Sequence, residues 1–350
     1  MDPRLHGDDH SREGGNPAQQ LNMNKFRTEI EIPSSDHKIS HQSTVLLIGS
    51  CFSEHIGNSL AEYKFNVDIN PTGIVYNPLS ALSCLRALVE NKKYLKEDLY
   101  ETNGRYVSFD HHGSFSDPNP DECLRKINER IKKASDRLAT TDYIILTFGT
   151  AWVYRLADSG RVVSNNHKLP AKYFTRELLK KEVIISHYQE LILEILKTNP
   201  NLRFIFTVSP VRHWKDGARF NMVSKSTLIL AVHELTGLFE TAEYFPAYEL
   251  AMDDLRDYRF YAGDMIHPNS QMTDYIWEKF SQTYFTGETI KLIEKLESIN
   301  RARDHKPFYP GTEEHKKFLN IQLKTIEELE KNHSFLDFSA EKEYFDNQLH

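Results

Sequence analysis

A cysteine near the start of the chain and an Asp-x-x-His pair in its last third are the residues best suited to acyl-transfer chemistry. Cys51 follows the apolar run 45–48 and the small residues Gly49 and Ser50. A buried strand that ends in a small-residue turn exposes the next side chain at the edge of its sheet. Residues 53–63 then have the spacing of an amphipathic helix, and the partial positive charge at a helix N-terminus favours a thiolate. Cys51 is therefore a candidate nucleophile, with a buried structural cysteine as the alternative interpretation.

Asp264 and His267 form the second part of this chemistry, in the short polar loop 263–269. A carboxylate three residues before a histidine can orient the imidazole through one ring nitrogen while the other faces a nucleophile. In isolation, the same spacing is typical of an Asx-type turn in a solvated loop. Together with Cys51, the pair predicts an acyl-transfer site in which Cys51 attacks, His267 is general base and acid, and Asp264 orients His267.

The stretch around the cysteine resembles the signature of the GSCFA family, a group related to the SGNH (GDSL-type) hydrolases. Residues 48–53 read Ile-Gly-Ser-Cys-Phe-Ser and align with the Gly-Asp-Ser nucleophile block, so that Cys51 stands where those enzymes carry serine. Ser50 is the alternative nucleophile, but it replaces the aspartate of that block and is expected to stabilise the turn through its hydroxyl. A thioester passes its acyl group readily to an amine or alcohol, so acyl transfer is as well supported as hydrolysis.

The resemblance continues in chain order through three further blocks. Residues 71–78 resemble the second block, residues 146–152 the third, and Asp264 with His267 the Asp-x-x-His of the last. The similar region spans about residues 23–280. It implies an SGNH-hydrolase-like, flavodoxin-like fold that carries a Cys-His-Asp triad.

The family resemblance also implies an oxyanion hole, made by the backbone N–H groups of Cys51 and Gly73 with Asn77 as a further donor. SGNH hydrolases usually add an asparagine side chain from the third block, but this sequence has Ala151 there. Removal of one oxyanion donor typically costs about 2.7–4 kcal/mol of transition-state stabilisation. Either another group supplies the donor or the reaction differs from ester hydrolysis. The candidate substitutes are Asn77, Asn166 and His167.

Polar and aromatic residues after the predicted strands are the expected substrate contacts, because loops at the carboxyl edge of a sheet often carry function. Arg212 can bind a carboxylate or phosphate, and Trp214 can cover an acyl group or stack on a sugar. Loop hydrogen bonding and surface packing are the alternative roles. The predicted substrate-binding residues are Ser50, Thr150, Trp152, Asn166, His167, Arg212 and His213.

Composition excludes several other classes of protein. The 350 residues carry a formal net charge of -7 and a pI near 6.2, which argues against a nucleic-acid-binding surface. No stretch approaches the roughly 20 apolar residues of a membrane-spanning helix. The three cysteines lack C-x-x-C spacing, which excludes a recognisable zinc ribbon or redox dithiol. Their odd, sparse count fits a reducing compartment and a cytoplasmic location, and Cys84 and Cys123 are expected to be structural. Neither a cofactor nor a metal is expected, and the predicted partner is a small-molecule or glycan acyl substrate, with homo-oligomerisation left open.

Strands that alternate with helices predict an α/β three-layer sandwich with a mainly parallel five-stranded sheet, hairpin insertions and a helical C-terminal extension. Hairpins are expected around Asn103-Gly104 and around residues 158–160. The expected core strands are 45–49, 65–69, 143–148, 203–208 and 241–245. The expected helices of the core include 78–90, 121–138 and 176–197.

Three regions are expected along the chain. Residues 1–22 are polar and lack a hydrophobic segment typical of a secretory signal, so they read as a disordered N-terminal extension that precedes a natural start at Met23. Residues 23–285 would form the catalytic domain, and residues 286–350 a helical, charged extension that packs on the core or on a partner subunit.

The leading functional hypothesis is a cofactor-independent acyl hydrolase or acyltransferase that acts on an ester or amide, with carbohydrate-linked or lipid-like acyl groups as the expected substrates. A non-catalytic ligand-binding protein on the same scaffold is the main alternative, because the oxyanion asparagine is missing and folds outlive their chemistry. A metal-dependent hydrolase using His167, His213 and His267 is disfavoured, since their spacing matches no ligand motif.

Overall fold

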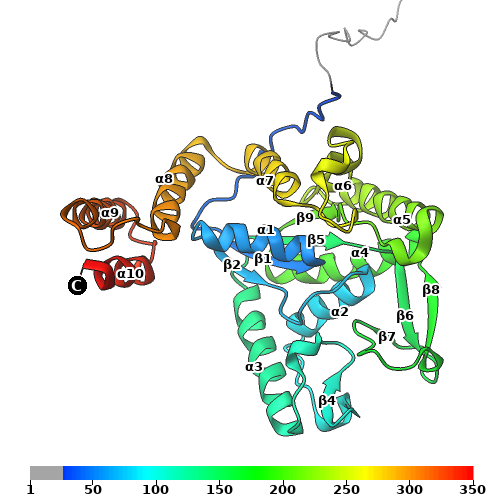
Figure 1. Ribbon diagram of the computed structural model, residues 1–350. Coiled ribbons are helices and arrows are strands. Elements are labelled where there is room, and N and C mark those ends of the chain that lie inside the picture. Colours follow the sequence, from blue (N-terminus) through cyan, green and yellow to red (C-terminus); the bar gives the residue numbers. More distant parts are fainter. Residues whose placement is uncertain (1–26, 350) are drawn as a thin grey trace, which may run out of the picture.

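The computed structural model describes residues 27–349, which are built around a five-stranded, entirely parallel sheet (Figure 1). The spatial order β2-β1-β5-β9-β10 is that of flavodoxin-like folds, in which the order of strands reverses between the first and third. Here the reversal lies between β1 and β5, so a crevice is expected outside the carboxyl ends of these two strands. In spatial order the strands are β2 (Asn66–Ile69), β1 (Thr44–Gly49), β5 (Tyr143–Phe148), β9 (Arg203–Val208) and β10 (Ala242–Phe245).

Both faces of the sheet are covered by helices, because successive side chains of a strand point to opposite sides. Leu46 and Ile48 of β1 belong to one apolar core, whereas Val45 and Leu47 belong to the other. The helices that contribute to the first core are α2 (Pro78–Val89), α3 (Pro120–Leu138), α4 (Lys181–Thr198) and α5 (Gly217–Leu238). Those that contribute to the second are α1 (Cys51–Glu62), α6 (Ala247–Glu249), α7 (Ser270–Tyr284) and, through Ile293, α8 (Gly287–Asp304).

Two antiparallel insertions extend from the layered core. The predicted hairpin at Asn103-Gly104 is present as β3 (Leu99–Thr102) and β4 (Arg105–Ser108), with Asn103 and Gly104 both at positive φ. The second insertion pairs β6 (Trp152–Leu156) with β7 (Val162–Val163), as expected, and also with β8 (Phe174–Leu178).

The start of the helix predicted at residues 176–197 was wrong. Residues 174–178 form strand β8, and helix α4 begins at Lys181. The Arg176 guanidinium lies 4.5 Å from the centre of the Trp152 ring and forms an ion pair with the buried Asp216 carboxylate. These cross-strand and tertiary contacts explain why the segment pairs with β6 and does not extend the helix that follows it.

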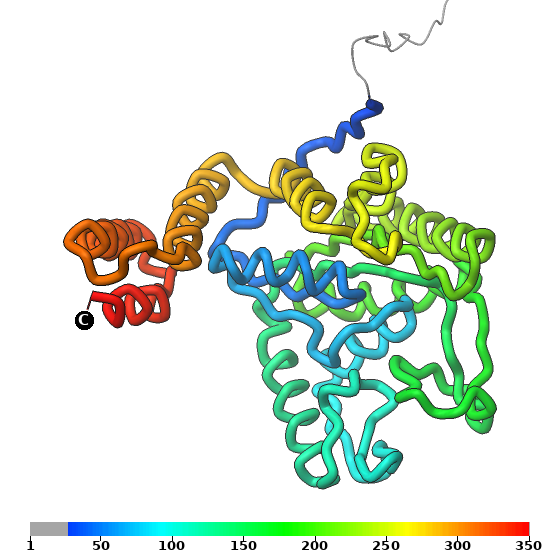
Figure 2. The backbone as a smooth tube through the Cα atoms, viewed as in Figure 1, coloured from blue at the N-terminus to red at the C-terminus, as the bar shows by residue number. Residues whose placement is uncertain are grey.

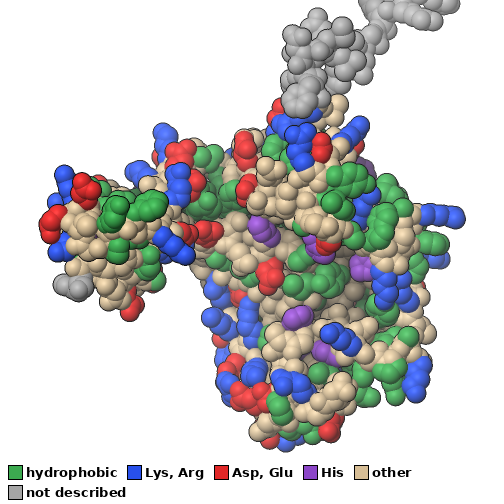
Figure 3. All heavy atoms as spheres, in the orientation of Figure 1, with side chains coloured by type: hydrophobic (Ala, Val, Ile, Leu, Met, Phe, Trp, Pro, Cys, Tyr) green, Lys and Arg blue, Asp and Glu red, His purple; other side chains and the backbone are tan. Residues whose placement is uncertain are grey.

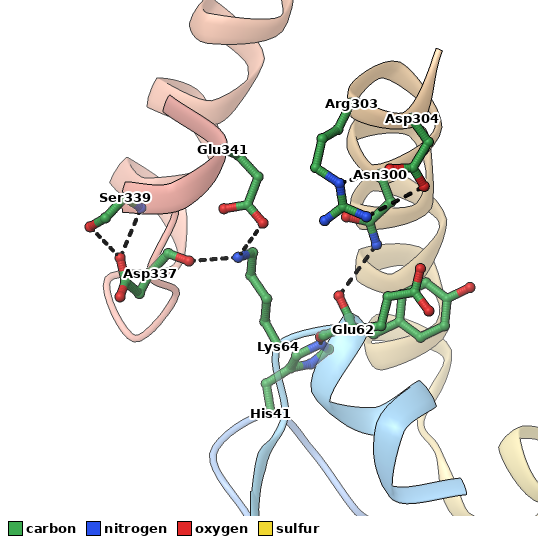
Figure 4. Close-up of polar contacts among 10 residues, drawn as sticks. His41, Glu62, Lys64, Asn300, Arg303, Asp304, Asp337, Ser339 and Glu341 are labelled. Atoms are coloured by element: carbon green, nitrogen blue, oxygen red, sulfur yellow. Dashed lines mark hydrogen bonds and ion pairs between the residues drawn. The ribbon is translucent and has the colours of Figure 1, made fainter. Parts of the chain in front are cut away.

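The last three helices form a separate apolar cluster beside the sheet, as the tube in Figure 2 shows at its orange and red end. They touch the core at the end of α1, where Lys64 Nζ donates hydrogen bonds to Glu341 Oε1 at 2.8 Å and to the Asp337 carbonyl at 2.7 Å (Figure 4). Asn300 Nδ2 also donates to the Glu62 carbonyl at 3.3 Å. These helices are α8 (Gly287–Asp304), α9 (Glu313–Asn332) and α10 (Ser339–Leu349).

The predicted fold class is confirmed: the chain is a three-layer α/β protein with a parallel five-stranded sheet within residues 27–349, antiparallel insertions and a helical C-terminal extension. Each predicted core strand is present to within a residue at either end. The N-terminal extension predicted for residues 1–22 lies outside the described residues. In the part of the chain that is described, no helix combines the length and apolar character needed to cross a bilayer.

Candidate active site

The turn that carries Cys51 is fixed by close contact between β1 and β5. A Cβ atom at Gly49 would overlap the Thr147 carbonyl oxygen and lie 2.8 Å from the Thr147 Cβ, so the two strands approach this closely only because residue 49 is glycine. The Gly49 N–H also donates to Asn70 Oδ1 at 2.9 Å. Ser50 caps helix α1, since its hydroxyl accepts a hydrogen bond from the Phe52 N–H at 3.3 Å. Cys51 is therefore the first residue of α1, at the carboxyl end of β1.

The Cys51 thiol differs from the expectation of a stabilised thiolate. Burial raises the pKa of the Cys51 thiol, and this effect outweighs the backbone N–H groups of Phe52 and of Cys51 itself, which lower it. The nearby Glu54 carboxylate raises the pKa further, whereas the Lys225 ammonium lowers it. At rest, this candidate nucleophile is a neutral thiol, which needs a base to become reactive.

Lys225, on helix α5, is a buried cation that the sequence reasoning missed. Its side chain is 1% exposed, and its Nζ donates a hydrogen bond of 2.6 Å to the Ser209 carbonyl at the end of β9. Burial lowers the pKa of Lys225 to about 7, against the attraction of the Cys51 and Glu249 groups, which raises it. The sequence signal was available, because Lys225 lies in the apolar stripe of α5 with Leu228 and Val232.

Asp264 and His267 lie together in the exposed loop after α6. His267 Nδ1 donates to Asp264 Oδ2 at 2.5 Å, and Asp264 Oδ1 accepts from the backbone N–H groups of Ile266 and His267 at 3.0 and 2.9 Å. These three hydrogen bonds hold the pKa of the Asp264 carboxyl well below its usual range, the bond from the His267 ring being the largest cause. The geometry fixes the tautomer with the proton on Nδ1, which leaves Nε2 as the basic nitrogen.

Cys51 and His267 line the same cavity, called here the inner cavity, which has a volume of about 420 Å³. It opens at the carboxyl ends of β1, β5 and β9, where the reversal of strand order places a crevice. No hydrogen bond joins the Cys51 sulfur to His267 within residues 27–349. Histidine side chains gather near the middle of the face shown in Figure 3, beside hydrophobic ones. The inner cavity is lined by Ser50, Cys51, Tyr76, Gly149, Ser209, Val211, Arg212, His213, Trp214, Lys215, Ile266 and His267.

Two of the residues predicted to form the oxyanion hole have other partners. The Gly73 N–H donates to the Asn70 carbonyl at 2.8 Å. The Asn77 side chain caps helix α2, where its Oδ1 accepts from the Ser80 N–H at 2.9 Å and its Nδ2 donates to the Ser80 hydroxyl at 2.9 Å. Neither residue lines the inner cavity. The remaining predicted donor is the backbone N–H of Cys51, which lies in the first turn of α1 and so has no partner within the helix.

Ala151, at the position of the family asparagine, is fully buried, and its N–H donates to the Ser224 hydroxyl at 2.7 Å. The inner cavity does offer His213, whose ring makes no hydrogen bond within the described residues. Burial lowers the pKa of His213, so that its imidazole is neutral near pH 7 and has one N–H to donate.

Four of the seven predicted substrate contacts lie away from the inner cavity. The Thr150 hydroxyl bonds the Ser224 hydroxyl at 3.1 Å, and the Trp152 ring packs on the Arg176 guanidinium. Asn166 Oδ1 accepts from the Lys168 N–H at 3.2 Å, and His167 Nε2 bonds the Ser108 carbonyl at 2.8 Å. The three that line the cavity are Ser50, Arg212 and His213.

The three histidines of the predicted metal-site alternative are not gathered together, since His213 and His267 line the inner cavity and His167 does not. More generally, no group of three or more His, Cys, Asp or Glu residues in the described part of the chain is placed to hold a metal ion. Cys84 and Cys123 are buried and free, as expected for structural cysteines.

The fold and the site together describe an α/β protein with a thiol, an imidazole and a carboxylate at the strand-order reversal. The GSCFA family model matches residues 44–280, and the model of the GSCFA domain protein, C-terminal domain, matches residues 296–350. The chain belongs to the GSCFA family, which confirms the resemblance seen in the sequence.

The chain was also compared with curated proteins and with solved structures. No curated protein matches the chain. Among solved structures it is similar to a carbohydrate esterase family 3 protein from Talaromyces cellulolyticus, with 11% identity, a TM-score of 0.32 and coverage of 72% of this chain and 99% of that one. The acetyl xylan esterase Est2A from Butyrivibrio proteoclasticus gives 11% identity, a TM-score of 0.34 and coverage of 72% and 64%.

A carbohydrate esterase family 2 enzyme with its carbohydrate binding domain, from Corynascus thermopiles (Myceliophthora fergusii), gives 13% identity, a TM-score of 0.35 and coverage of 76% and 69%. At these TM-scores the likenesses carry no information on what this chain does.

Proposed function

We propose that this protein is an acyl hydrolase or acyltransferase that uses Cys51, His267 and Asp264 on an ester or amide substrate, with carbohydrate-linked acyl groups as one substrate class. The observation that supports it best is that Cys51 and His267 line one cavity while Asp264 holds His267 Nδ1. Because Asp264 engages Nδ1, Nε2 remains the basic nitrogen that can accept a proton in the proposed reaction.

The reaction begins when His267 Nε2 takes the proton of the Cys51 thiol and the sulfur attacks the substrate carbonyl carbon. The negative charge that develops on the carbonyl oxygen is stabilised by the Cys51 N–H at the start of α1 and by the His213 ring N–H. The bond to the leaving alcohol or amine then breaks, and His267 gives the leaving group its proton. The product of this half-reaction is a thioester on Cys51.

The second half-reaction reverses these proton transfers. His267 takes a proton from water or from an acceptor alcohol or amine, which attacks the thioester carbon, and the C–S bond breaks. The sulfur recovers the proton from His267, and the site returns to its resting state. Because burial raises the pKa of the Cys51 thiol, the attack needs His267 to remove the thiol proton.

Cys51→Ala tests this proposal against short-chain thioesters and para-nitrophenyl esters. We expect the variant to lose the turnover that the wild type shows, because the covalent intermediate cannot form. Cys84→Ala is the matched control, since it removes a thiol that is buried in α2. Equal activity of the wild type and Cys51→Ala would remove Cys51 from the mechanism.

A non-catalytic ligand-binding protein on this scaffold is the second candidate function. It is favoured by the raised pKa of the Cys51 thiol and by the Gly73 N–H, which is bonded to Asn70. The two functions predict different results for one measurement, the pH dependence of the rate of Cys51 alkylation in the wild type and in His267→Ala. A base that acts on the thiol makes the alkylation rate depend on His267, whereas a binding protein needs no such dependence.

A further inference from the structure

A second cavity adjoins the inner cavity and has a different character. This outer cavity has a volume of about 520 Å³ and shares Arg212, Trp214 and Ile266 with the inner one. Its remaining wall is largely apolar and aromatic, and Tyr258 and Met265 at its rim are 73% and 54% exposed. The two cavities therefore adjoin at these three residues, and the inner one is lined by Cys51.

Arg212 lies at the junction of the two cavities without a carboxylate partner. Within residues 27–349 its guanidinium makes no ion pair, and its one hydrogen bond runs to the Met252 sulfur at 3.2 Å. The Arg212 Nε is buried and has no hydrogen-bond partner. A buried guanidinium N–H without an acceptor costs free energy, so this arrangement favours an incoming acceptor.

The two carboxylates that line the outer cavity, Asp257 and Asp264, are already engaged. Asp264 is bonded to His267, and Asp257, which also lines the outer cavity, is paired with Arg259 at 2.9 Å. They leave Arg212 as the charged group of the junction that lacks a counter-ion among the described residues.

The charge of the inner cavity also favours an anionic ligand. Its lining contains two cationic side chains, Arg212 and Lys215, and no aspartate or glutamate, although the whole chain has a net charge of -7. Cationic groups gathered in a cleft of an acidic protein attract anionic ligands and raise their local concentration.

We propose that Arg212 binds an anionic oxygen group of the substrate, a carboxylate or a phosphate, while the apolar or ring portion of the substrate lies in the outer cavity. This inference rests on the proposed function and narrows it to esters or amides that carry a negative charge near the reacting carbonyl. Arg212 forms the specificity-determining contact, because a guanidinium fork matches the geometry of both carboxylate and phosphate.

Two acyl groups of the same chain length test the proposal directly: the para-nitrophenyl monoester of glutaric acid, which carries a carboxylate, and the para-nitrophenyl ester of valeric acid, which does not. We expect the wild type to favour the glutarate ester in kcat/KM by about 10- to 100-fold, the range of a charge-assisted hydrogen bond. Arg212→Gln should reduce this ratio to near one through a higher KM for the glutarate ester, and Arg212→Lys should restore part of it.

Arg219→Gln is the control variant, because Arg219 is exposed on α5 and lines neither cavity, so the ratio should stay as in the wild type. A wild type without preference for the glutarate ester, or a preference that persists in Arg212→Gln, would overturn the proposal.

Binding of non-reacting anions separates this proposal from the proposed function. Calorimetric titration of the wild type with glutarate and with inorganic phosphate should show binding of at least one, and the ion that binds identifies a carboxylate or a phosphate as the natural group. Arg212→Gln should abolish this binding. If neither ester is turned over but anion binding depends on Arg212, the catalytic proposal fails and the anion site stands. If the esters are turned over but neither anion binds, the anion site is wrong.

Discussion

The two sides of the inner cavity are built in different ways. On the nucleophile side, Cys51 follows β1, an interior strand of the sheet, and the turn before it is held by the contact of Gly49 with Thr147 and by the Ser50 cap. On the histidine side, Asp264 and His267 lie on a loop in which their side chains are 48% and 56% exposed. That loop is held by its own hydrogen bonds, such as the one from the Ala262 N–H to the His267 carbonyl at 2.7 Å.

This difference indicates which half of the site can move. The position of the sulfur is set by the packing of the whole sheet, whereas the imidazole is set by a few local bonds on an exposed segment. The absence of a Cys51–His267 hydrogen bond within residues 27–349 is consistent with such a division, because catalytic hydrogen bonds often tighten only when substrate is bound. We expect the histidine loop to adjust to the sulfur, and not the reverse.

His267→Ala should have a large effect on activity with little effect on stability. Loss of the general base is expected to lower kcat/KM by about 10²- to 10⁴-fold, while the exposed position of His267 should leave the melting temperature nearly unchanged. His233→Ala, on the exposed face of α5, is the control for loss of a histidine. Steady-state kinetics and thermal melts of the three proteins check this, and an unaltered kcat/KM in His267→Ala would contradict the assigned base.

Gly49→Ala should show the opposite behaviour, a large loss of stability. The added Cβ overlaps the Thr147 carbonyl oxygen, so the β1–β5 contact must open at a cost of about 2–3 kcal/mol in the free energy of unfolding. Gly263→Ala is the matched variant in the histidine loop, where an added Cβ meets nothing within 4 Å, and it should change that free energy by less than about 0.5 kcal/mol. Urea denaturation measures the free energy of unfolding of both variants. Equal losses in the two variants would contradict the proposed difference between the two sides of the cavity.

Lys225→Met should give a smaller effect that depends on pH. The pKa of Lys225 is about 7 in the folded protein and near 10.5 in the unfolded chain, so between these values the unfolded state binds the extra proton. The wild type therefore gains stability relative to Lys225→Met as the pH rises, by about 2 kcal/mol between pH 7 and pH 9.

Urea denaturation of the wild type and Lys225→Met at both pH values checks this sign. Lys197→Met, at an exposed position of α4, should show no such change with pH. A difference between the wild type and Lys225→Met that stays constant, or that reverses in sign, would show that Lys225 does not titrate as a buried amine.

The sequence predicts best those candidate site residues that come directly after a strand or lie within one short loop. Continuous apolar runs predict β1 and β5, and Cys51, which was expected at the sheet edge after β1, lines the inner cavity. The Asp264–His267 pair could also be predicted from the sequence, because its geometry depends on a local spacing of three residues. The predicted turn role of Ser50 is confirmed by its cap.

The features that the sequence did not predict depend on tertiary contacts. Asn77 is a helix cap because Ser80 stands three residues later, and in the folded chain this local bond competes with any role in the oxyanion hole. The raised pKa of the Cys51 thiol arises from burial by segments distant in the chain, which outweighs the local effect of the helix N-terminus. The strand at residues 174–178 is specified by its partner β6, which periodicity within the segment does not show.

The most direct test of the central claim is the intact mass of the protein after brief incubation with a panel of acyl thioesters and para-nitrophenyl esters. We predict a mass increase equal to one acyl group in the wild type, located on Cys51 by peptide mapping, absent in Cys51→Ala and formed more slowly in His267→Ala. An acyl group on another residue, or turnover in Cys51→Ala with no covalent species, would contradict the account.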